Sequence, residues 1–240
     1  MSVRCECGHE FEPKIDYRHK LICGDCTDKA VVERVMGGER ADMVFTDPPY
    51  GIDVVPDSGR IGGGSNIAPS TKFNKVINDD IEVDILFLLD LAKTQIIWGG
   101  NYFAHKLPRG TQWLVWDKDQ TDNEEKRLSF GGCELAWTNL QGKSVRKYKN
   151  RWVGFSMEGE SGQRIHPNQK PIKLLTRILD DYSKADDLIV DPFLGSGTTL
   201  IACERLNRKC RAVEISPAYV AVAIQRWVDV TGGVPVLLSN

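Results

Sequence analysis

Short apolar runs that end at turn residues recur along the chain and predict buried strands. The clearest lie at residues 43–46, 95–98, 113–116 and 188–190, and a further one spans residues 210–215. Runs of this length, bounded by Gly, Pro, Asn or Asp, are typical of strands inside a sheet rather than of helices. We therefore expect these segments to form one common sheet.

Other segments carry apolar residues at helical spacing. Pro171 is expected at a first helical position, before a stripe that packs on the sheet: Ile172, Leu174, Leu175, Ile178, Leu179 and Tyr182. Another helix follows residue 199, with Asn207 as its expected end and with one apolar face: Leu200, Cys203 and Leu206.

Two further helices are expected at about residues 84–92 and 217–230, the second capped by Ser216-Pro217. No internal repeat is apparent. Strands that alternate with helices predict an α/β fold with a mostly parallel sheet.

Composition sets the bounds of this fold. The chain has 240 residues, 41% of them hydrophobic and 27% charged, which is ordinary for one α/β domain. No apolar stretch approaches membrane length and no signal peptide is present, so we expect a cytoplasmic protein. The net charge of −2 means that any attraction to phosphates must be local.

Asp47-Pro48-Pro49-Tyr50 follows the first strand and joins a carboxylate, a rigid turn and an aromatic ring. Proline fixes φ and lacks an amide donor, so two in succession leave carbonyl groups pointing outward as free acceptors. Asp47 and the Pro48 carbonyl are thereby suited to bind one amino group. A strand that ends in a proline turn beside a buried tyrosine is the simpler interpretation, and the context decides between them.

A glycine-containing loop, Asp191-Pro192-Phe193-Leu194-Gly195-Ser196-Gly197-Thr198-Thr199, follows the strand at residues 188–190. Glycine lets the backbone approach a ligand closely. The next strand ends at Glu214, about twenty residues on, where nucleotide-binding sheets place an acid that accepts from ribose hydroxyls. Because the loop lacks G-x-G-x-x-G and G-K-[ST], a ligand with ribose but no phosphate fits best. A purely structural glycine turn is the alternative.

Together, these segments resemble the amino-group DNA methyltransferases that use S-adenosylmethionine. Asp47-Pro48-Pro49-Tyr50 is similar to their catalytic motif, the 191–199 loop to their cofactor loop, and His166-Pro167-Asn168-Gln169-Lys170-Pro171 to the segment before the cofactor helix. Further similar segments are Leu21-Ile22-Cys23-Gly24-Asp25, Gly99-Gly100-Asn101-Tyr102-Phe103 and Trp113-Leu114-Val115-Trp116-Asp117-Lys118. The resemblance thus covers nearly the whole chain, in the motif order of the permuted β group.

The resemblance implies a fold as well as a cofactor. The fold is a single catalytic domain over residues 1–240, with a Rossmann-like, doubly wound, mostly parallel seven-stranded sheet of the class I methyltransferase type, circularly permuted. The catalytic strand then lies beside the cofactor strand, at the carboxyl ends of the sheet. The cofactor is S-adenosyl-L-methionine, and the residues expected to bind it are Asp25, Lys170, Asp191, Phe193, Gly195, Gly197, Thr198 and Glu214.

Individual roles follow from the same resemblance. Glu214 is expected to hold the ribose, Asp25 the adenine, and Lys170 the carboxylate of the cofactor, while Phe193 packs against it. Gly195 and Gly197 are expected to let groups of the cofactor come close to the backbone of the loop. Asp25 as a turn residue and Lys170 as a surface charge are the alternatives.

The catalytic residues implied are Asp47, Pro48, Pro49 and Tyr50. The lone pair of an exocyclic amine is delocalised into its ring, so acceptors on both amino hydrogens favour the pyramidal nitrogen of the transition state. Tyr50 is expected to stack on a base flipped out of the duplex. Asp rather than Ser at position 47 favours N6 of adenine, with N4 of cytosine as the alternative.

A basic segment at residues 143–152 carries five cations, no acid and two aromatic rings. We expect its cations to follow a DNA backbone and its rings to support bases: Lys143, Arg146, Lys147, Lys149 and Arg151, with Tyr148 and Trp152. A solvated basic face is the alternative. The resemblance places target recognition here, at about residues 117–165.

Residues 53–75 are rich in Gly, Pro, Ser and Asn around Gly62-Gly63-Gly64, without a periodic apolar pattern. A long structureless loop inside a compact domain tends to be a functional lid or disordered. Because this one leaves directly from the catalytic motif, we expect a mobile lid that orders over DNA, with plain disorder as the alternative.

Seven cysteines, an odd number scattered along the chain, indicate reduced thiols rather than disulfides. Cys5, Cys7, Cys23 and Cys26 are the right residue type for zinc, but one residue rather than two separates the first pair, so no metal is assigned. The other three lie in apolar segments and are expected in the core: Cys133, Cys203 and Cys210.

Double-stranded DNA is the partner that the resemblance implies, and a second copy of the chain and a cognate restriction endonuclease are further candidates. A non-catalytic DNA-binding module that kept the fold is the alternative from another class, which an intact Asp47 and cofactor loop oppose. A protein or RNA methyltransferase is disfavoured by Asp47, where those relatives usually carry Asn, and by the basic insertion.

Overall fold

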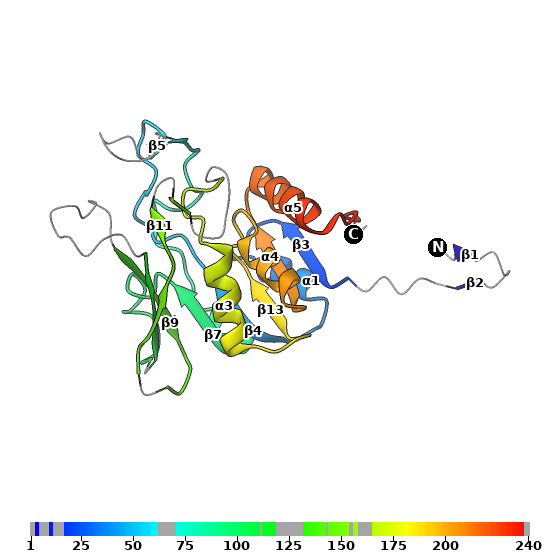
Figure 1. The fold of residues 1–240 in the computed structure, drawn as a ribbon, viewed down its shortest axis with the longest axis horizontal. Coiled ribbons are helices and arrows are strands. Elements are labelled where there is room, and N and C mark those ends of the chain that lie inside the picture. The colour runs from blue at the N-terminus through cyan, green and yellow to red at the C-terminus, as the bar shows by residue number, and fades with distance from the viewer. Residues whose placement is uncertain are drawn as a thin grey trace.

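A computed structural model of the chain describes residues 3–4, 10–11, 17–61, 71–110, 112–118, 132–142, 144–153, 156–157 and 165–237. Its centre is one sheet (Figure 1), whose strands in spatial order are β10 (Arg146–Lys149), β8 (Trp113–Asp117), β9 (Cys133–Thr138), β7 (Ala92–Trp98), β4 (Ala41–Thr46), β13 (Leu188–Asp191), β14 (Lys209–Glu214) and β3 (His19–Cys23). Within it β9 runs antiparallel to both neighbours, and every other pairing is parallel. The doubly wound, mostly parallel sheet is confirmed, with eight described strands rather than seven.

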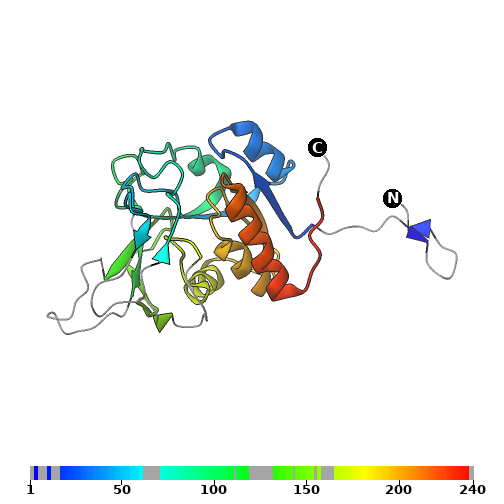
Figure 2. The ribbon, with the colours of Figure 1, turned by 90° about the horizontal axis from the view of Figure 1, so that it is seen from above.

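The helices cover both faces of this sheet. They are α1 (Lys29–Met36), α2 (Leu88–Leu91), α3 (Ile172–Tyr182), α4 (Thr198–Arg205) and α5 (Pro217–Thr231). Figure 2 shows α1 on one side and the α3, α4 and α5 group on the other. Within the described part of the chain, none of these helices is long and apolar enough to cross a membrane.

Three two-stranded hairpins lie outside the main sheet. They pair β1 (Val3–Arg4) with β2 (Glu10–Phe11), β5 (Arg60–Ile61) with β6 (Thr71–Lys72), and β11 (Trp152–Val153) with β12 (Ser156–Met157). The expected lid at residues 53–75 therefore contains the β5–β6 pairing instead of being structureless, whereas its Gly62-Gly63-Gly64 centre lies outside the described residues.

Strand β4 shows how the layers are built. Met43 and Phe45 point into the core that α3 and α4 cover, whereas Val44 between them belongs to the core under α1. Successive side chains of a strand point to opposite faces, so an uninterrupted apolar run needs cover on both. The run at residues 43–46 thus specified a central strand.

The stripe predicted on α3 is confirmed. Its inward positions are buried: Ile172, Leu174, Leu175, Ile178 and Leu179. Each fully buried aliphatic side chain contributes about 1.5–3 kcal/mol relative to exposure, so this face holds the helix on the sheet. Pro171 precedes the first helical residue in an extended conformation, as the N-cap rather than inside the first turn.

Helix α4 ends where expected. Asn207, directly after its last residues, has φ of 56°, a left-handed conformation that asparagine tolerates better than most residues. The chain then turns into β14, whose first residue donates its amide to Asp187.

The helix expected at residues 84–92 is wrong in extent. Only Leu88–Leu91 is helical, because Ala92 is already extended and pairs with Ala41 in the sheet.

Cys133, expected in the core, is exposed at the start of β9, whereas Cys203 and Cys210 are buried. The apolar neighbourhood of Cys133 belongs to the following residues of its strand.

The basic segment is also corrected. Residues 146–149 form the edge strand β10, and Tyr148 and Trp152 are 3% and 1% exposed in the core. The Tyr148 hydroxyl donates to Asp181 of α3 at 2.6 Å. Tyr148 faces inward because alternate residues of an edge strand do so, and Trp152 in β11 is buried in the same core, so neither ring is free to support bases.

We expect Tyr148→Ala to lower the free energy of unfolding by about 3 kcal/mol or more, since it removes a buried aromatic ring and leaves a cavity. Urea unfolding followed by circular dichroism measures this. Arg146→Ala, on the exposed side of the same strand, should change stability by no more than about 0.5 kcal/mol. Equal effects of the two substitutions would contradict the core assignment.

Candidate active site

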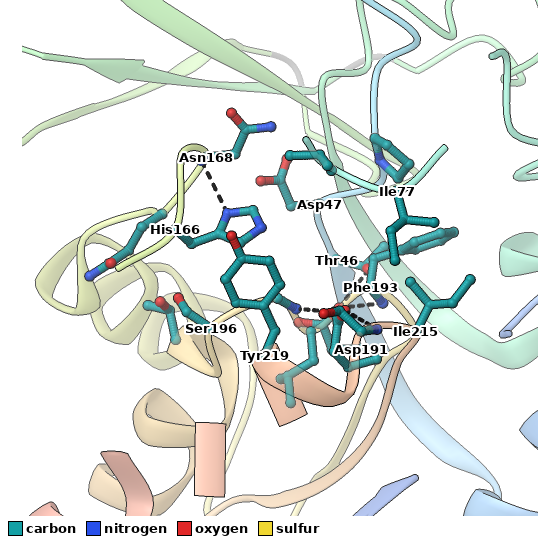
Figure 3. A pocket seen from close by; sticks show the side chains of 18 of the residues that line it. Thr46, Asp47, Ile77, His166, Asn168, Asp191, Phe193, Ser196, Ile215 and Tyr219 are labelled. Atoms are coloured by element: carbon teal, nitrogen blue, oxygen red, sulfur yellow. Dashed lines mark hydrogen bonds between the residues drawn. The ribbon is translucent and has the colours of Figure 1, made fainter. Parts of the chain in front are cut away.

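A cavity of about 510 Å³ opens at the carboxyl ends of β4, β13 and β14. It is lined by Thr46 at the end of β4, by Asp47 directly after it, and by Asp191 at the end of β13. Figure 3 shows these residues facing the same hollow together with His166 from the segment before α3. The edge of an α/β sheet where strands end is the usual ligand site of such folds.

A buried hydrogen bond joins the two main motifs. Thr46 Oγ1 donates to Asp191 Oδ1 at 2.6 Å, and the Phe193 amide donates to the same oxygen at 3.1 Å. Burial raises the pKa of Asp191 to about 6, against the opposing effect of its donors. The pairing of β4 with β13, expected from the sequence, thus fixes the start of the glycine loop against the Asp47 strand.

Glu214 ends β14 at the cavity wall. Its Oε2 accepts from the Gly195 amide and its Oε1 from the Ser216 amide, both at 2.8 Å. Burial raises the pKa of this carboxyl. Ser216 occupies the N-cap position of α5, as expected, but its side chain makes no cap hydrogen bond there. The acid therefore organises the loop as well as facing the cavity.

Asp25 follows β3, the strand that pairs with β14, and so lies beside Glu214 at the cavity. Asp25 Oδ1 accepts from the amide and the hydroxyl of Thr27, at 2.9 and 2.7 Å, so Asp25 is a turn residue that also lines the cavity. Asp28 caps α1 by accepting from Ala30 at 2.9 Å.

The Asp47 carboxylate lies between two donors. Tyr50 donates its hydroxyl to Oδ1 at 2.6 Å, and Lys170 contacts Oδ2. Burial raises the pKa of Asp47 while the Lys170 ammonium opposes that rise. Burial and the adjacent Asp47 raise the pKa of Tyr50 well above its usual value, so its hydroxyl stays a donor.

Lys170 does not stand free at the cavity wall. Its ammonium also lies 3.3 Å from Glu134 Oε2 of β9, which in turn pairs with Lys118 at 2.7 Å. The role expected from the resemblance, holding a cofactor carboxylate, is therefore not the arrangement seen, because two protein carboxylates already bind this cation.

The Tyr50 ring is covered on one face. It stacks on Tyr102, with ring centroids 4.8 Å apart and an angle of 15° between the planes. A Cβ on Gly99 would lie 2.1 Å from the ring, so glycine is required there to admit it. A base that stacks on Tyr50 must therefore use its other face or displace Tyr102, which is 44% exposed.

Asp79 holds the turn that follows Asp47. Its Oδ1 accepts from the amides of Tyr50 and Gly51, at 2.9 and 3.2 Å, and its Oδ2 from Val54 at 2.8 Å. Asp79 is only 2% exposed. A single buried carboxylate thus binds three backbone donors of a segment without regular structure and fixes the course of the turn.

Several predicted site residues lie apart from the cavity. Pro48, Tyr50 and Gly197 are not among its lining residues, whereas Asp25, Lys170, Asp191, Phe193, Gly195, Thr198 and Glu214 are. Gly197 has φ of 86°, and a Cβ there would lie 2.8 Å from Cβ of Ala223 in α5. Close packing of α5 and this backbone angle therefore account for Gly197 being glycine.

The basic residues belong to β10 and to the residues next to it, at the end of the sheet that is separated from β4 by β8, β9 and β7. Arg146, Lys147, Lys149 and Arg151 are exposed, and Lys147 pairs with Asp117 at 3.2 Å, while Lys143 lies outside the described residues. Since β10 runs parallel to β8, Arg151 follows its carboxyl end, on the side where the cavity opens.

Sequence reasoning missed Asp79, Tyr102 and Glu134. No spacing rule links them to Asp47, although Tyr102 lies in the Gly99-Gly100-Asn101-Tyr102-Phe103 segment already singled out.

Cys5 and Cys7 lie outside the described residues, and Cys23 and Cys26 are free thiols, so the four-cysteine zinc site stays a hypothesis. Within the described segments, no group of three or more His, Cys, Asp or Glu is placed to hold a metal.

Comparison with known proteins gives three kinds of match. A family model described as DNA methylase matches residues 93–225. The type II methyltransferase M2.LlaDCHI of Lactococcus lactis subsp. cremoris is 32% identical over 127 residues, 52% of this chain and 44% of that protein. The type II methyltransferase M.HinfI of Haemophilus influenzae is 25% identical over 255 residues, 88% of this chain and 68% of that protein. The chain thus spans less than half the length of the first relative.

Two solved structures share the fold. The M1.HpyAVI–SAM complex superposes with a TM-score of 0.54 at 18% identity, over 87% of this chain and 99% of that chain. The cytosine-N4-specific PvuII DNA methyltransferase superposes with a TM-score of 0.54 at 17% identity, over 89% and 87%. These likenesses concern the fold.

Asp79→Ala should lower the free energy of unfolding by about 3 kcal/mol, because it removes a buried carboxylate that accepts from three amides of the turn. Limited proteolysis should also show faster cleavage at residues 50–54, where those amides lie. Asp90→Ala, an exposed acid of α2, is the matched control. Unchanged stability and cleavage in Asp79→Ala would refute its role in holding the turn.

Proposed function

This chain belongs to the DNA methylase family of amino-group methyltransferases, and we propose that it moves the methyl group of S-adenosylmethionine to the exocyclic N6 of adenine in double-stranded DNA. The observation that carries the proposal is the shared cavity. Asp47 and the Asp191 loop line it from adjacent strands, joined through the Thr46 hydroxyl.

The chemistry of the cavity fits the cofactor. Three carboxylates, Asp25, Asp191 and Glu214, line its cofactor side. They would repel a polyphosphate, because like charges repel in a partly desolvated site, but they suit a ligand with a cationic centre and ribose hydroxyls. A volume of about 510 Å³ is within the usual range of small-molecule sites.

Specific residues would hold this group. Glu214 accepts ribose hydroxyls with the lone pairs that its backbone partners leave free, and Phe193 provides an apolar wall. Asp25 also lines the cavity, and we assign it the contact with adenine that the resemblance implies. When bound, S-adenosylmethionine supplies an electrophilic methyl group on a sulfonium.

Asp47 performs the positioning chemistry. Its carboxylate faces the cavity, and with the carbonyl of Pro48, which lies between the lining residues Asp47 and Pro49, it accepts the two hydrogens of the target amino group. Acceptors placed in advance favour the pyramidal nitrogen that attacks the methyl carbon. Two successive prolines fix φ in this turn, so the backbone that carries the Pro48 carbonyl is extended and rigid.

DNA is the substrate class that the exposed cations support. Lys149 and Arg151 lie at and after the carboxyl end of β10, on the edge of the sheet where the cavity opens, and Arg146 is exposed at the start of the same strand. Phosphate contacts from such cations position a duplex without reading its sequence. The target base must leave the duplex to reach Asp47, at a cost of a few kcal/mol.

Adenine is favoured over cytosine by the aspartate at position 47. The two substrates share the chemistry of an amino group conjugated to a ring, so N4 of cytosine is the outcome that would change the substrate and keep the mechanism.

The experiment that tests the proposal is transfer of radiolabelled methyl from S-adenosylmethionine to unmethylated genomic DNA, followed by nucleoside separation. We expect label in N6-methyladenine. Asp47→Ala should reduce turnover at least about a hundredfold, the scale of losing one preorganised transition-state group, while cofactor binding is kept. Asp90→Ala is the control. No label in any nucleoside, or full activity of Asp47→Ala, would refute the proposal.

Tyr50→Ala should weaken retention of the flipped base by roughly 1–3 kcal/mol, the value of one aromatic stacking contact. Fluorescence of 2-aminopurine at the target position reports the flipped state. Asp47→Ala, which keeps the ring, should retain the signal. An unchanged signal in Tyr50→Ala would count against stacking by Tyr50.

A further inference from the structure

Lys170 is a buried cation shared by two carboxylates, one of which faces the cavity. Its side chain is 5% exposed, contacts Asp47 Oδ2, and lies 3.3 Å from Glu134 Oε2. It also donates to the Tyr50 hydroxyl at 3.2 Å. A buried ammonium is retained when partners balance its charge and satisfy its hydrogens, and here all three partners belong to the Asp47 environment.

Glu134 extends this arrangement away from the cavity. It is carried by β9, and its Oε1 pairs with Lys118, which lies over the Trp116 ring at 5.0 Å. Charges therefore alternate from Asp47 through Lys170 and Glu134 to Lys118. Burial alone would raise the pKa of Glu134, but the Lys170 and Lys118 ammonium groups hold it below its usual value.

We propose that Lys170 and Glu134 are positioning residues that act through Asp47. Lys170 keeps the Asp47 carboxylate ionised and directed into the cavity. Glu134 shares the Lys170 ammonium, and its own negative charge opposes ionisation of Asp47, so it limits the effect of Lys170. This inference rests on the proposed function, in which the Asp47 carboxylate accepts a hydrogen bond from the target amino group. A protonated Asp47 would present a donor to the amino group and lose the contact.

The described charged and titratable groups around Asp47 come from several elements, and His166, from the segment before α3, faces the same hollow (Figure 3). Lys170 approaches from the segment before α3, Glu134 from β9, and the Tyr50 hydroxyl from the turn after β4. Asp191 lies behind Thr46 on β13. Burial has the largest effect and raises the pKa of Asp47; Lys170 lowers it and Glu134 raises it.

The two neighbours therefore have opposite signs. Lys170→Met removes the ammonium, so Asp47 should stay protonated to a higher pH, and the acid limb of the methyl-transfer rate should move up by about one pH unit. Glu134→Gln removes a repelling charge, so the same limb should move to lower pH. Lys170→Arg should keep the limb near its original position.

The test is single-turnover methyl transfer measured across pH, together with ¹³C NMR titration of labelled aspartate carboxyls. The Asp47 signal is assigned by its loss in Asp47→Asn. Lys184→Met and Glu33→Gln, both exposed and remote, are matched controls and should move neither the rate limb nor the NMR titration. Circular dichroism and binding of S-adenosylmethionine show that each variant is folded.

The outcomes separate this inference from the proposed function. If the unaltered protein transfers no methyl group, the function fails, while the NMR titration still decides whether Lys170 and Glu134 shift Asp47 in opposite directions. Shifts in one direction, or none, would overturn the inference even in an active enzyme. Should Lys170→Met fail to fold, the downward shift in Glu134→Gln still decides it.

Discussion

The site depends on the parallel pairing of β4 with β13 and on the hydrogen bond that Thr46 donates to Asp191 across it. The two residues are 145 positions apart in the sequence, yet their oxygens lie 2.6 Å apart and both residues are fully buried. A buried, charge-assisted hydrogen bond of this kind is costly to break, because each group would be left unpaired. It holds the glycine loop and the Asp47 turn in one register, so a ligand on the loop meets the Asp47 carboxylate.

Around this bond, the acidic side chains and the buried lysine lie on different sides of the cavity. The side of the cavity formed by the ends of β13, β14 and β3 carries Asp25, Asp191 and Glu214, whose oxygens accept mainly from backbone amides and hydroxyls. The Asp47 side carries Lys170, which two carboxylates balance. Charge is thereby distributed so that one part of the cavity stays anionic while a single carboxylate next to it is neutralised by an ammonium.

Whether a feature could be predicted from the sequence depends on how far apart its interacting residues lie in the chain. The strands at residues 43–46 and 188–190 and the α3 stripe were predictable, because apolar periodicity reflects burial directly. The short α2 was not, because pairing of Ala92 with β4 overrides local helix preference. Tyr148 and Trp152 were assigned to a DNA surface, since composition cannot show which face of an edge strand turns inward.

The sequence by itself determined the α/β class, the central strands, and the two motifs at Asp47 and Asp191, because each is a local pattern of burial or turn chemistry. Only the tertiary structure decided that Lys170 binds Asp47 and Glu134, that Asp79 holds the Tyr50 turn, and that Gly197 is required by α5. Those contacts join segments far apart in the chain. Their geometry follows from strand order and packing, which no local spacing encodes.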